Sequence, residues 1–254
     1  MIVKDLTNDP TICIVGCLHG DELLGKEIIE KLSSEMPHLP IRTIIANEEA
    51  MAKKVRCIDT DLNRSFPGSV NRGNEERLAV KILEQTKKCK YVIDIHSTTS
   101  NMDDCIITTT QSFRKKRTRD LIKRVPIKNV IIMNKFIGKN SSLIDHVACG
   151  ISIEFNYSKS VPFVLEIVKS TIRNIIEDRI EGNKNYFKIV RSMKSNGITR
   201  IEVENFAEVK KGREFAVSDG KKITARYDLC PVFINEKAYT GIACLISKKL
   251  NVDQ

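Results

Sequence analysis

Short apolar runs alternate with amphipathic segments along the first two thirds of the chain. Continuous apolar runs of strand length occur at residues 11–16, 41–46, 91–96, 105–109, 129–133 and 150–155. Segments with apolar positions at helical spacing occur at residues 22–33, 75–88, 111–125 and 162–179. Strands that alternate with helices are typical of a largely parallel sheet with helices on both faces. The pattern therefore predicts an α/β fold with a mixed, largely parallel sheet.

The pattern changes near residues 181–184. Beyond this point, short β-type runs at residues 186–191, 198–203 and 231–234 are separated by Gly, Asn and Lys turns. No low-complexity linker separates the two parts. We therefore expect a catalytic domain at residues 1–181 and a small β-rich domain at residues 182–254, packed against each other.

The segment at residues 47–73 has little periodicity. Structureless segments of this length inside a compact domain are usually functional. This one contains Arg56 and the run DLNR at residues 61–64, so it is a candidate for part of a site.

The composition is that of an ordinary globular protein, with 254 residues, 41% hydrophobic and 29% charged. No stretch approaches the roughly 20 apolar residues of a membrane helix, and the first residues lack a secretory signal. The eight cysteines are scattered and form no C-x-x-C pair, which favours reduced, mostly buried thiols. We therefore expect a cytoplasmic protein that does not bind membranes.

The chain carries 42 Lys and Arg against 32 Asp and Glu, a net charge of +10. Such an excess is compatible with a nucleic-acid partner or with an anionic small substrate. The densest basic run, at residues 114–119, falls in the expected helix at 111–125, which has apolar positions for a buried face. Because no aromatic platform accompanies this run and the chain has no Trp, a solvated helix face is favoured over nucleic-acid binding.

Two of the four histidines, His19 and His96, follow apolar strand-like runs. The carboxyl ends of parallel strands are where ligand sites lie. Glu22 is three residues after His19, at the expected start of a helix, so both side chains can reach one cation. Two His and one carboxylate are a usual ligand set for catalytic zinc. The spacing alone is weak, and a solvated helix start remains an alternative.

Two further carboxylates stand in apolar runs. Asp94 alternates with His96 on one face of a strand, where it can support the metal ligand or line the site. Its alternative is a carboxylate satisfied by nearby backbone. Glu154 lies in the run at residues 150–155, where burial would raise its pKa toward the range of a general base. An ion-paired core glutamate is equally compatible with the sequence.

Five ordered motifs carry a resemblance to a known family. Residues 19–22 (HGDE) look like an H-G-[ND]-E motif, residues 61–64 like D-L-N-R, and residues 94–102 like D-L-H-x-T-T-S-N-M. Residues 150–154 align with a segment that holds a catalytic glutamate, and residues 231–239 resemble P-V-F-V-N-E-x-A-Y. The chain thus resembles the aspartoacylase and succinylglutamate desuccinylase family, a branch of the zinc carboxypeptidase-like fold.

The resemblance implies a zinc-dependent amidohydrolase that removes the acyl group from an N-acyl amino acid. It implies one Zn²⁺ per chain, held by His19, Glu22 and His96. It further implies that Arg56 polarises the scissile carbonyl and that Glu154 activates the zinc-bound water.

The same resemblance assigns substrate binding to Asn63, Arg64 and Tyr239, which would hold the carboxylate of the amino acid. Aspartoacylases carry a further arginine and tyrosine before the catalytic glutamate, and residues 139–144 offer neither. Lys135 or Lys139 could substitute, although an ammonium group fits a bidentate site less well than a guanidinium group. Activity on N-acetylaspartate is therefore not implied.

Two other functions remain as alternatives. A zinc carboxypeptidase acting on peptides would use the same metal and base. A non-catalytic basic scaffold or nucleic-acid-binding protein would use the charge of +10 instead. The resemblance also makes a homodimer plausible.

Overall fold

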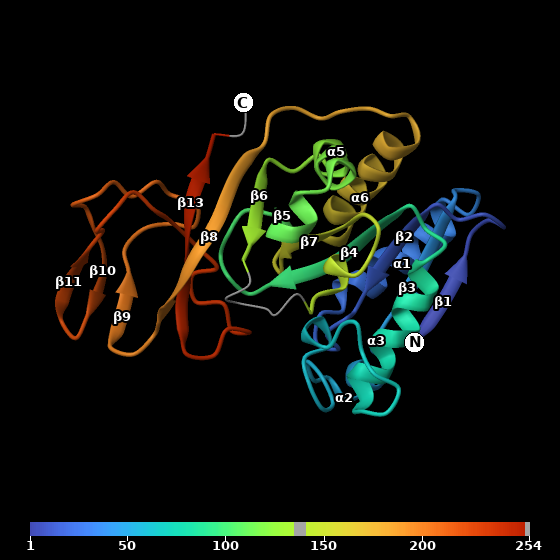
Figure 1. The fold of residues 1–254 in the computed structure, drawn as a ribbon, viewed down its shortest axis with the longest axis horizontal. Coiled ribbons are helices and arrows are strands. Elements are labelled where there is room, and N and C mark those ends of the chain that lie inside the picture. The colour runs from blue at the N-terminus through green and yellow to red at the C-terminus, as the bar shows by residue number, and fades with distance from the viewer. Residues whose placement is uncertain (135–140, 252–254) are drawn as a thin grey trace.

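The structure is a computed structural model that describes residues 1–134 and 141–251 (Figure 1). Its strands are β1 (Ile2–Asp5), β2 (Ile12–Gly16), β3 (Ile41–Ile45), β4 (Tyr91–Thr98), β5 (Cys105–Thr109), β6 (Asn129–Met133), β7 (Gly150–Asn156), β8 (Asn185–Lys194), β9 (Ile198–Ile201), β10 (Glu214–Ser218), β11 (Lys221–Thr224), β12 (Cys230–Val232) and β13 (Ile242–Leu250). Its helices are α1 (Leu24–Glu35), α2 (Glu48–Lys53), α3 (Asn74–Thr86), α4 (Thr110–Phe113), α5 (Lys116–Arg124) and α6 (Val161–Ile176), with 3₁₀ turns η1 (Leu62–Arg64) and η2 (Leu143–Asp145).

A ten-stranded sheet runs through the molecule in the order β1-β3-β2-β4-β7-β5-β6-β8-β13-β12. The pairs β3–β2, β2–β4, β4–β7, β5–β6 and β6–β8 are parallel. β5 runs antiparallel to β7. The link from β4 to β5, residues 99–104, is too short for a parallel return, which needs about a dozen residues or more. The sheet is mixed and largely parallel, as predicted.

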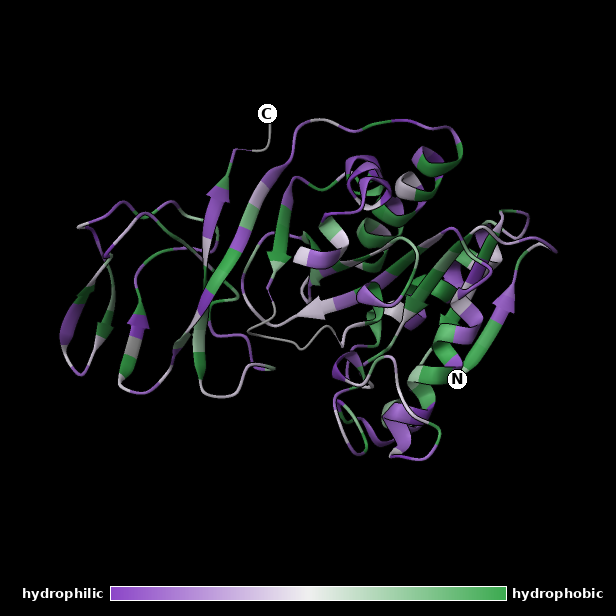
Figure 2. Ribbon diagram, viewed as in Figure 1, coloured by the Kyte–Doolittle hydropathy of each residue, from purple (hydrophilic) through white to green (hydrophobic). Residues whose placement is uncertain are grey.

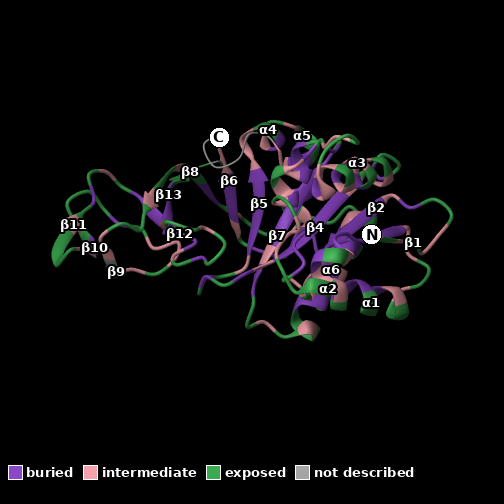
Figure 3. Ribbon diagram, turned by 90° about the horizontal axis from the view of Figure 1, so that it is seen from below, coloured by how far each residue is buried: buried purple, intermediate pink, exposed green. Residues whose placement is uncertain are grey.

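Helices cover both faces of this sheet, which confirms the second part of the prediction. One apolar core packs α1, α5 and α6 against the sheet through residues such as Ile28, Leu121 and Val168. A second core on the opposite face joins α3, through Ala79 and Ile82, to β2. The central strands are mostly hydrophobic (Figure 2) and buried (Figure 3). Their continuous apolar runs reflect burial on both sides.

The carboxyl-terminal strands divide between two sheets. β8, β13 and β12 extend the ten-stranded sheet, whereas β9, β10 and β11 form a separate three-stranded antiparallel sheet. The boundary between residues 181 and 182 stays a prediction. The small antiparallel sheet accounts for the β-rich character of the region, and β8 makes the rest continuous with the larger part of the fold.

The helix expected at residues 111–125 is two helices, α4 and α5, so that prediction was wrong at its centre. The first helix ends at Phe113, and Lys115, the N-cap of α5, has an extended backbone with φ −73° and ψ 122° that separates the two helices. The Lys115 ammonium donates to the carbonyl of Val147, and the Ser112 hydroxyl donates to that of Ile144. These hydrogen bonds attach the break between α4 and α5 to the segment around η2, in place of the backbone hydrogen bonds of a continuous helix. In the described part of the chain, no helix is long and apolar enough to cross a membrane.

Candidate metal centre and substrate cavity

A cavity of about 680 Å³ lies between the large sheet, the segment that follows β3 and the loop that follows β12. The described residues that line it come from more than five separate parts of the chain. All eight residues singled out from the sequence line it: His19, Glu22, Arg56, Asn63, Arg64, His96, Glu154 and Tyr239.

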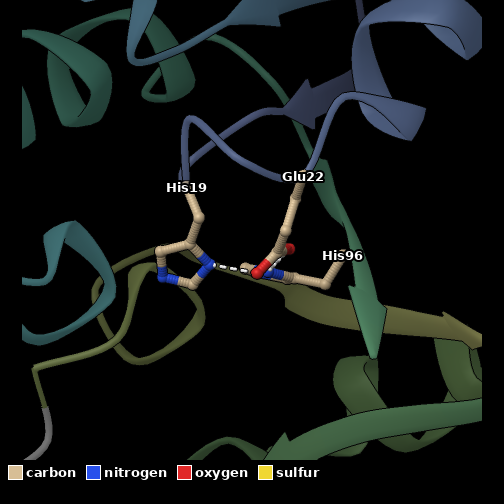
Figure 4. Close-up of side chains that lie close together, drawn as sticks. All are labelled: His19, Glu22 and His96. Atoms are coloured by element: carbon tan, nitrogen blue, oxygen red, sulfur yellow. Dashed lines mark hydrogen bonds and ion pairs between the residues drawn. The ribbon is translucent and has the colours of Figure 1, made fainter. Parts of the chain in front are cut away.

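His19, Glu22 and His96 form a compact group in its wall (Figure 4). One potential ligand atom from each lies within 4.8 Å of the others. Glu22 Oε1 is 2.6 Å from His19 Nδ1, and Glu22 Oε2 is 2.9 Å from His96 Nδ1. Glu22 is in the turn before α1 rather than in the helix, which begins at Leu24. The turn returns its carboxylate toward His19.

Each imidazole also contacts a second carboxylate through its other nitrogen. His19 Nε2 is 3.0 Å from Asp61 Oδ1, and His96 Nε2 is 2.6 Å from Asp94 Oδ2. Burial would lower the pKa of His96, but Asp94 and Glu22 raise it well above its usual value. Asp94 therefore lies beside His96 on the same face of the strand and supports its imidazole, as expected from the alternation of the two residues. Carboxylates that hold the outer nitrogens leave both Nδ1 atoms facing Glu22, an arrangement that fits a zinc ion.

Asp61 belongs to the DLNR motif at residues 61–64, and nothing in the local sequence indicates its contact with His19. Its other oxygen, Oδ2, accepts from Arg56 Nη2 at 3.1 Å. Its Oδ1 also accepts the backbone N–H of Asn63 at 2.9 Å. Although burial opposes ionisation, the hydrogen bond and charge of His19, together with the charge of Arg56, hold the pKa of Asp61 well below its usual value. One carboxylate thus orients a histidine, an arginine and the start of η1.

The loop between Arg56 and Asp61 is fixed by a buried residue that the sequence analysis missed. Glu75, at the start of α3, has no exposed surface. Its carboxylate accepts three backbone N–H groups at 2.7, 2.9 and 3.2 Å, those of Ile58, Asp59 and Thr60. In the sequence, Glu75 resembles an ordinary acidic residue of a first helical turn. Only the fold shows that it organises the loop.

Glu154 lies on β7 beside the histidine pair. Its carboxylate accepts no hydrogen bond from residues 1–134 or 141–251. Burial in the cavity wall, with the nearby negative charges of Glu22 and Glu236, raises its pKa to about 8, although His96 acts in the opposite direction. A carboxyl group with such a pKa can exchange a proton near neutral pH. The ion-paired core alternative is thus not what the structure shows.

Asn63 and Arg64 belong to η1 and face the same cavity. Asn63 Oδ1 accepts the backbone N–H of Leu143 at 3.1 Å, which fixes the turn against η2. The Arg64 guanidinium donates to the carbonyl of Asn63 at 2.8 Å and is otherwise exposed. It remains available for an anionic group.

Tyr239 reaches the cavity because Glu236 anchors its loop, a role the sequence analysis did not identify. The buried Glu236 carboxylate accepts from the hydroxyl of Thr98, from the backbone N–H and hydroxyl of Thr99, both at 2.9 Å, and from the N–H of Ser100 at 3.0 Å. These bonds fasten the carboxyl-terminal loop to the end of β4. Lys135 and Lys139, which could substitute for the missing arginine, lie outside the described residues.

Comparisons with known proteins identify the family of this chain. Residues 8–168 match the family model of the succinylglutamate desuccinylase/aspartoacylase catalytic domain. The chain is 25% identical to N-acyl-aromatic-L-amino acid amidohydrolase (carboxylate-forming) B of Danio rerio, over 95% of this chain and 93% of that protein. It is 26% identical to a probable aspartoacylase of Prochlorococcus marinus (strain AS9601), over 94% and 93%.

Solved structures show the same fold. Murine aminoacylase 3 superposes with a TM-score of 0.77 at 19% identity, covering 96% of each chain. Succinylglutamate desuccinylase from Vibrio cholerae superposes with a TM-score of 0.70 at 19% identity, covering 98% of this chain and 83% of that one.

Proposed function

Because the chain belongs to the succinylglutamate desuccinylase/aspartoacylase family, as its motifs predicted, we propose that it is a zinc-dependent hydrolase of N-acyl amino acids. It would cleave the linear amide bond between acyl group and amino acid. The observation that carries this proposal is the meeting of His19, Glu22 and His96 with an unpaired Glu154 in one cavity. Relatives named amidohydrolase and aspartoacylase support the same reaction class.

Two imidazoles and one carboxylate match the three protein ligands of a catalytic zinc, which keeps a further position open. His19, Glu22 and His96 would hold one zinc ion per chain, with Asp61 and Asp94 orienting the imidazoles. Zinc, when bound, supplies a Lewis acid that acidifies water and polarises the scissile carbonyl.

Glu154 and Arg56 would perform the remaining chemistry. The Glu154 carboxylate takes a proton from the attacking water, whose oxygen bonds to the carbonyl carbon. It then gives that proton to the amine nitrogen as the carbon–nitrogen bond breaks, which releases a carboxylate and a free amino acid. The Arg56 guanidinium donates hydrogen bonds to the carbonyl oxygen as negative charge develops there.

Asn63, Arg64 and Tyr239 would bind the carboxylate of the amino acid. A guanidinium group suits this task because it can donate two parallel hydrogen bonds. The loop that carries Tyr239 is fastened by Glu236 beside the end of β4, where it would narrow the entrance to the cavity. This arrangement favours small acylated amino acids over peptides, the substrates of the carboxypeptidase alternative.

The basic-scaffold alternative has less support, because three side chains of the basic run, those of Lys115, Lys116 and Arg119, already make hydrogen bonds within the protein. Lys115 donates to the carbonyl of Val147, and Arg119 donates to two backbone carbonyls. We propose a cytoplasmic location, since all eight cysteines are free and seven are buried.

The test is to measure bound metal and amine release on the purified protein. N-acetyl and N-succinyl amino acids are assayed beside carboxyl-terminal dipeptide substrates, with and without a chelator. We expect about one zinc per chain and hydrolysis of acyl amino acids that stops on chelation and returns with zinc. Failure to turn over any acyl amino acid with zinc restored would refute the proposal, and faster cleavage of peptides would favour the carboxypeptidase.

A further inference from the structure

We propose that one face of the paired strands β8 and β13 binds the phosphodiester backbone of a nucleic acid without regard to base sequence. Arg191 and Lys248 would contact the phosphates, with Tyr227 holding both side chains in place and Lys188 beside them. This surface is separate from the basic run at residues 114–119 and shares no residue with the proposed metal centre. The inference goes beyond the proposed hydrolase and does not depend on it.

β8 and β13 lie side by side (Figure 1) and carry charge of only one sign. They contain no Asp or Glu. Their exposed cations are Lys188, Arg191, Lys194, Lys248 and Lys249. Among the residues that the structure describes, only Lys249 of these five has a carboxylate partner, Glu208, at 2.7 Å. A surface with unpaired cations and no carboxylates attracts a polyanion.

A β-bulge in β8 brings Arg191 to the face that carries Lys188 and Lys248. Lys188 pairs with Lys248 in the antiparallel register, so their side chains project from the same face. Strict alternation from Lys188 would place Arg191 on the opposite face. The register shifts at this point, however, so that Val190 is an extra residue and Arg191 pairs with Ile246, two residues from Lys248. Three cations therefore share one face.

The aromatic ring of Tyr227 brings two of these cations together. Arg191 Cζ lies 5.5 Å and Lys248 Nζ lies 5.3 Å from the ring centroid. The ring is half-buried and packs against the apolar core that contains Phe215 and Ile246. Cations at this distance are attracted by the π electrons of the ring. Because the ring restricts both side chains in advance, less conformational entropy is lost when they bind a phosphate.

The carboxylate next to Tyr227 is engaged elsewhere. Asp228 accepts from Lys210 Nζ at 3.0 Å and from the backbone N–H of Lys211 at 2.9 Å. Within residues 1–134 and 141–251, the side chains of Arg191 and Lys248 make no hydrogen bond and no ion pair. Their positive charge is therefore available to a ligand.

The character of this surface favours a nucleic acid over a membrane or a protein. Among the residues described, no exposed large hydrophobic side chain lies beyond Ile180. The surface therefore has no apolar group to insert into lipid and no apolar hot spot for a protein partner. Tyr227 is engaged by two cations and is not free to stack on a base. Contacts made by cations alone recognise phosphates and carry no sequence information.

The test is a fluorescence anisotropy titration of the full-length protein with labelled nucleic acids, a mixed-sequence DNA duplex and an RNA strand of equal length. We expect a dissociation constant of about 10⁻⁴–10⁻⁶ M for the duplex near physiological salt. Each phosphate neutralised contributes about −0.9 to the slope of log K against log salt. Two or three contacts should therefore give a slope of about −2 to −3.

Arg191→Gln and Lys248→Gln should each weaken duplex binding about tenfold at about 50 mM salt and reduce the slope by about one. Lys194→Gln is the matched control, because Lys194 is an exposed cation of the same strand on the other face. It pairs with Ile242, whose side chain packs against the core on that face. Its binding should equal that of wild type. Lys188 is left unchanged because it also lines the substrate cavity.

Absence of binding at about 50 mM salt, or binding unchanged in the double variant Arg191→Gln, Lys248→Gln, would overturn the inference. Tighter binding to phosphatidylserine vesicles or to polyglutamate than to either nucleic acid would also overturn it, because the partner would then belong to another class. The titration needs neither zinc nor turnover. Its outcome is therefore independent of the proposed hydrolase activity.

Discussion

His96 and Glu154 are direct partners in the register of the neighbouring parallel strands β4 and β7. Their side chains therefore project from the same face of the sheet. Both strands lie in the buried centre of the sheet, so backbone hydrogen bonds, rather than a flexible loop, fix the separation of the proposed ligand and the proposed base.

Replacing this base without changing its shape tests its role. Glu154→Gln should lower kcat by about 10²–10⁴-fold, the usual contribution of a general base. Bound zinc and KM should change little, because Glu154 is not among the proposed ligands. Steady-state kinetics and metal analysis check both, with the exposed Glu166→Gln on α6 as the control. A large loss of metal from Glu154→Gln would contradict the assignment.

The same substitution should stabilise the metal-free protein at high pH. The pKa of Glu154 rises from 4.5 to about 8 in the folded state, mainly because of burial. Below pH 4.5 the carboxyl is neutral in both states, and above pH 8 the folded protein must ionise it in an unfavourable place. The free energy of unfolding of Glu154→Gln should therefore exceed that of wild type by roughly 1–4 kcal/mol above pH 8. Urea denaturation with chelator at pH 4.5 and 8.5 measures the difference, which should be much smaller at the lower pH, where the unfolded carboxyl is only half ionised.

Asp94→Asn should weaken zinc binding by about 10–100-fold. The amide can donate a hydrogen bond to His96 Nε2, which moves the imidazole proton to Nδ1, the nitrogen that faces Glu22. Competition with a zinc chelator measures the dissociation constant. Asp61→Asn should act in the same direction through His19. An unchanged zinc affinity in both variants would show that these carboxylates do not orient the ligands.

Glu75→Gln should destabilise the protein by about 2 kcal/mol, because an amide cannot accept all three backbone N–H groups that the carboxylate accepts. Catalysis should also fall, since Arg56 immediately precedes the loop that these hydrogen bonds hold in place. Despite burial, those hydrogen bonds hold the pKa of Glu75 below its usual 4.5. Its contribution is thus present above pH 4.5 and lost as the pH falls further. Denaturation of Glu75→Gln and of the exposed Glu84→Gln on the same helix measures the effect.

The best-predicted elements are the buried strands, because each appears in the sequence as an unbroken run of apolar residues. The strands at 105–109 and 129–133 have the predicted bounds, and β7 ends one residue later than predicted. His19 was identifiable because it follows such a run, and His96 because it ends the run at residues 91–96, although β4 continues two residues further, to Thr98. The local pattern was sufficient where burial on both sides demanded an unbroken apolar run.

Long-range pairing could not be found in this way. The strand β1 is short and mostly exposed, so it has no apolar signature. The bonds of Glu75 to the loop before it, and of Glu236 to the end of β4, join residues about 15 and 137 positions apart. A glutamate in a first helical turn or in a loop looks solvent-exposed in sequence. Its burial is a property of the tertiary fold.

The strand β8 closes what would otherwise be a bare edge. It pairs with β6 and connects the large sheet to β13 and β12. A chain ending at residue 181 would leave the buried strand β6 with a row of unpaired N–H and C=O groups, which readily recruit another strand. Such a fragment should self-associate into insoluble aggregates instead of behaving as a smaller enzyme. Residues 1–181 therefore need the strands that follow them in order to fold as a soluble unit.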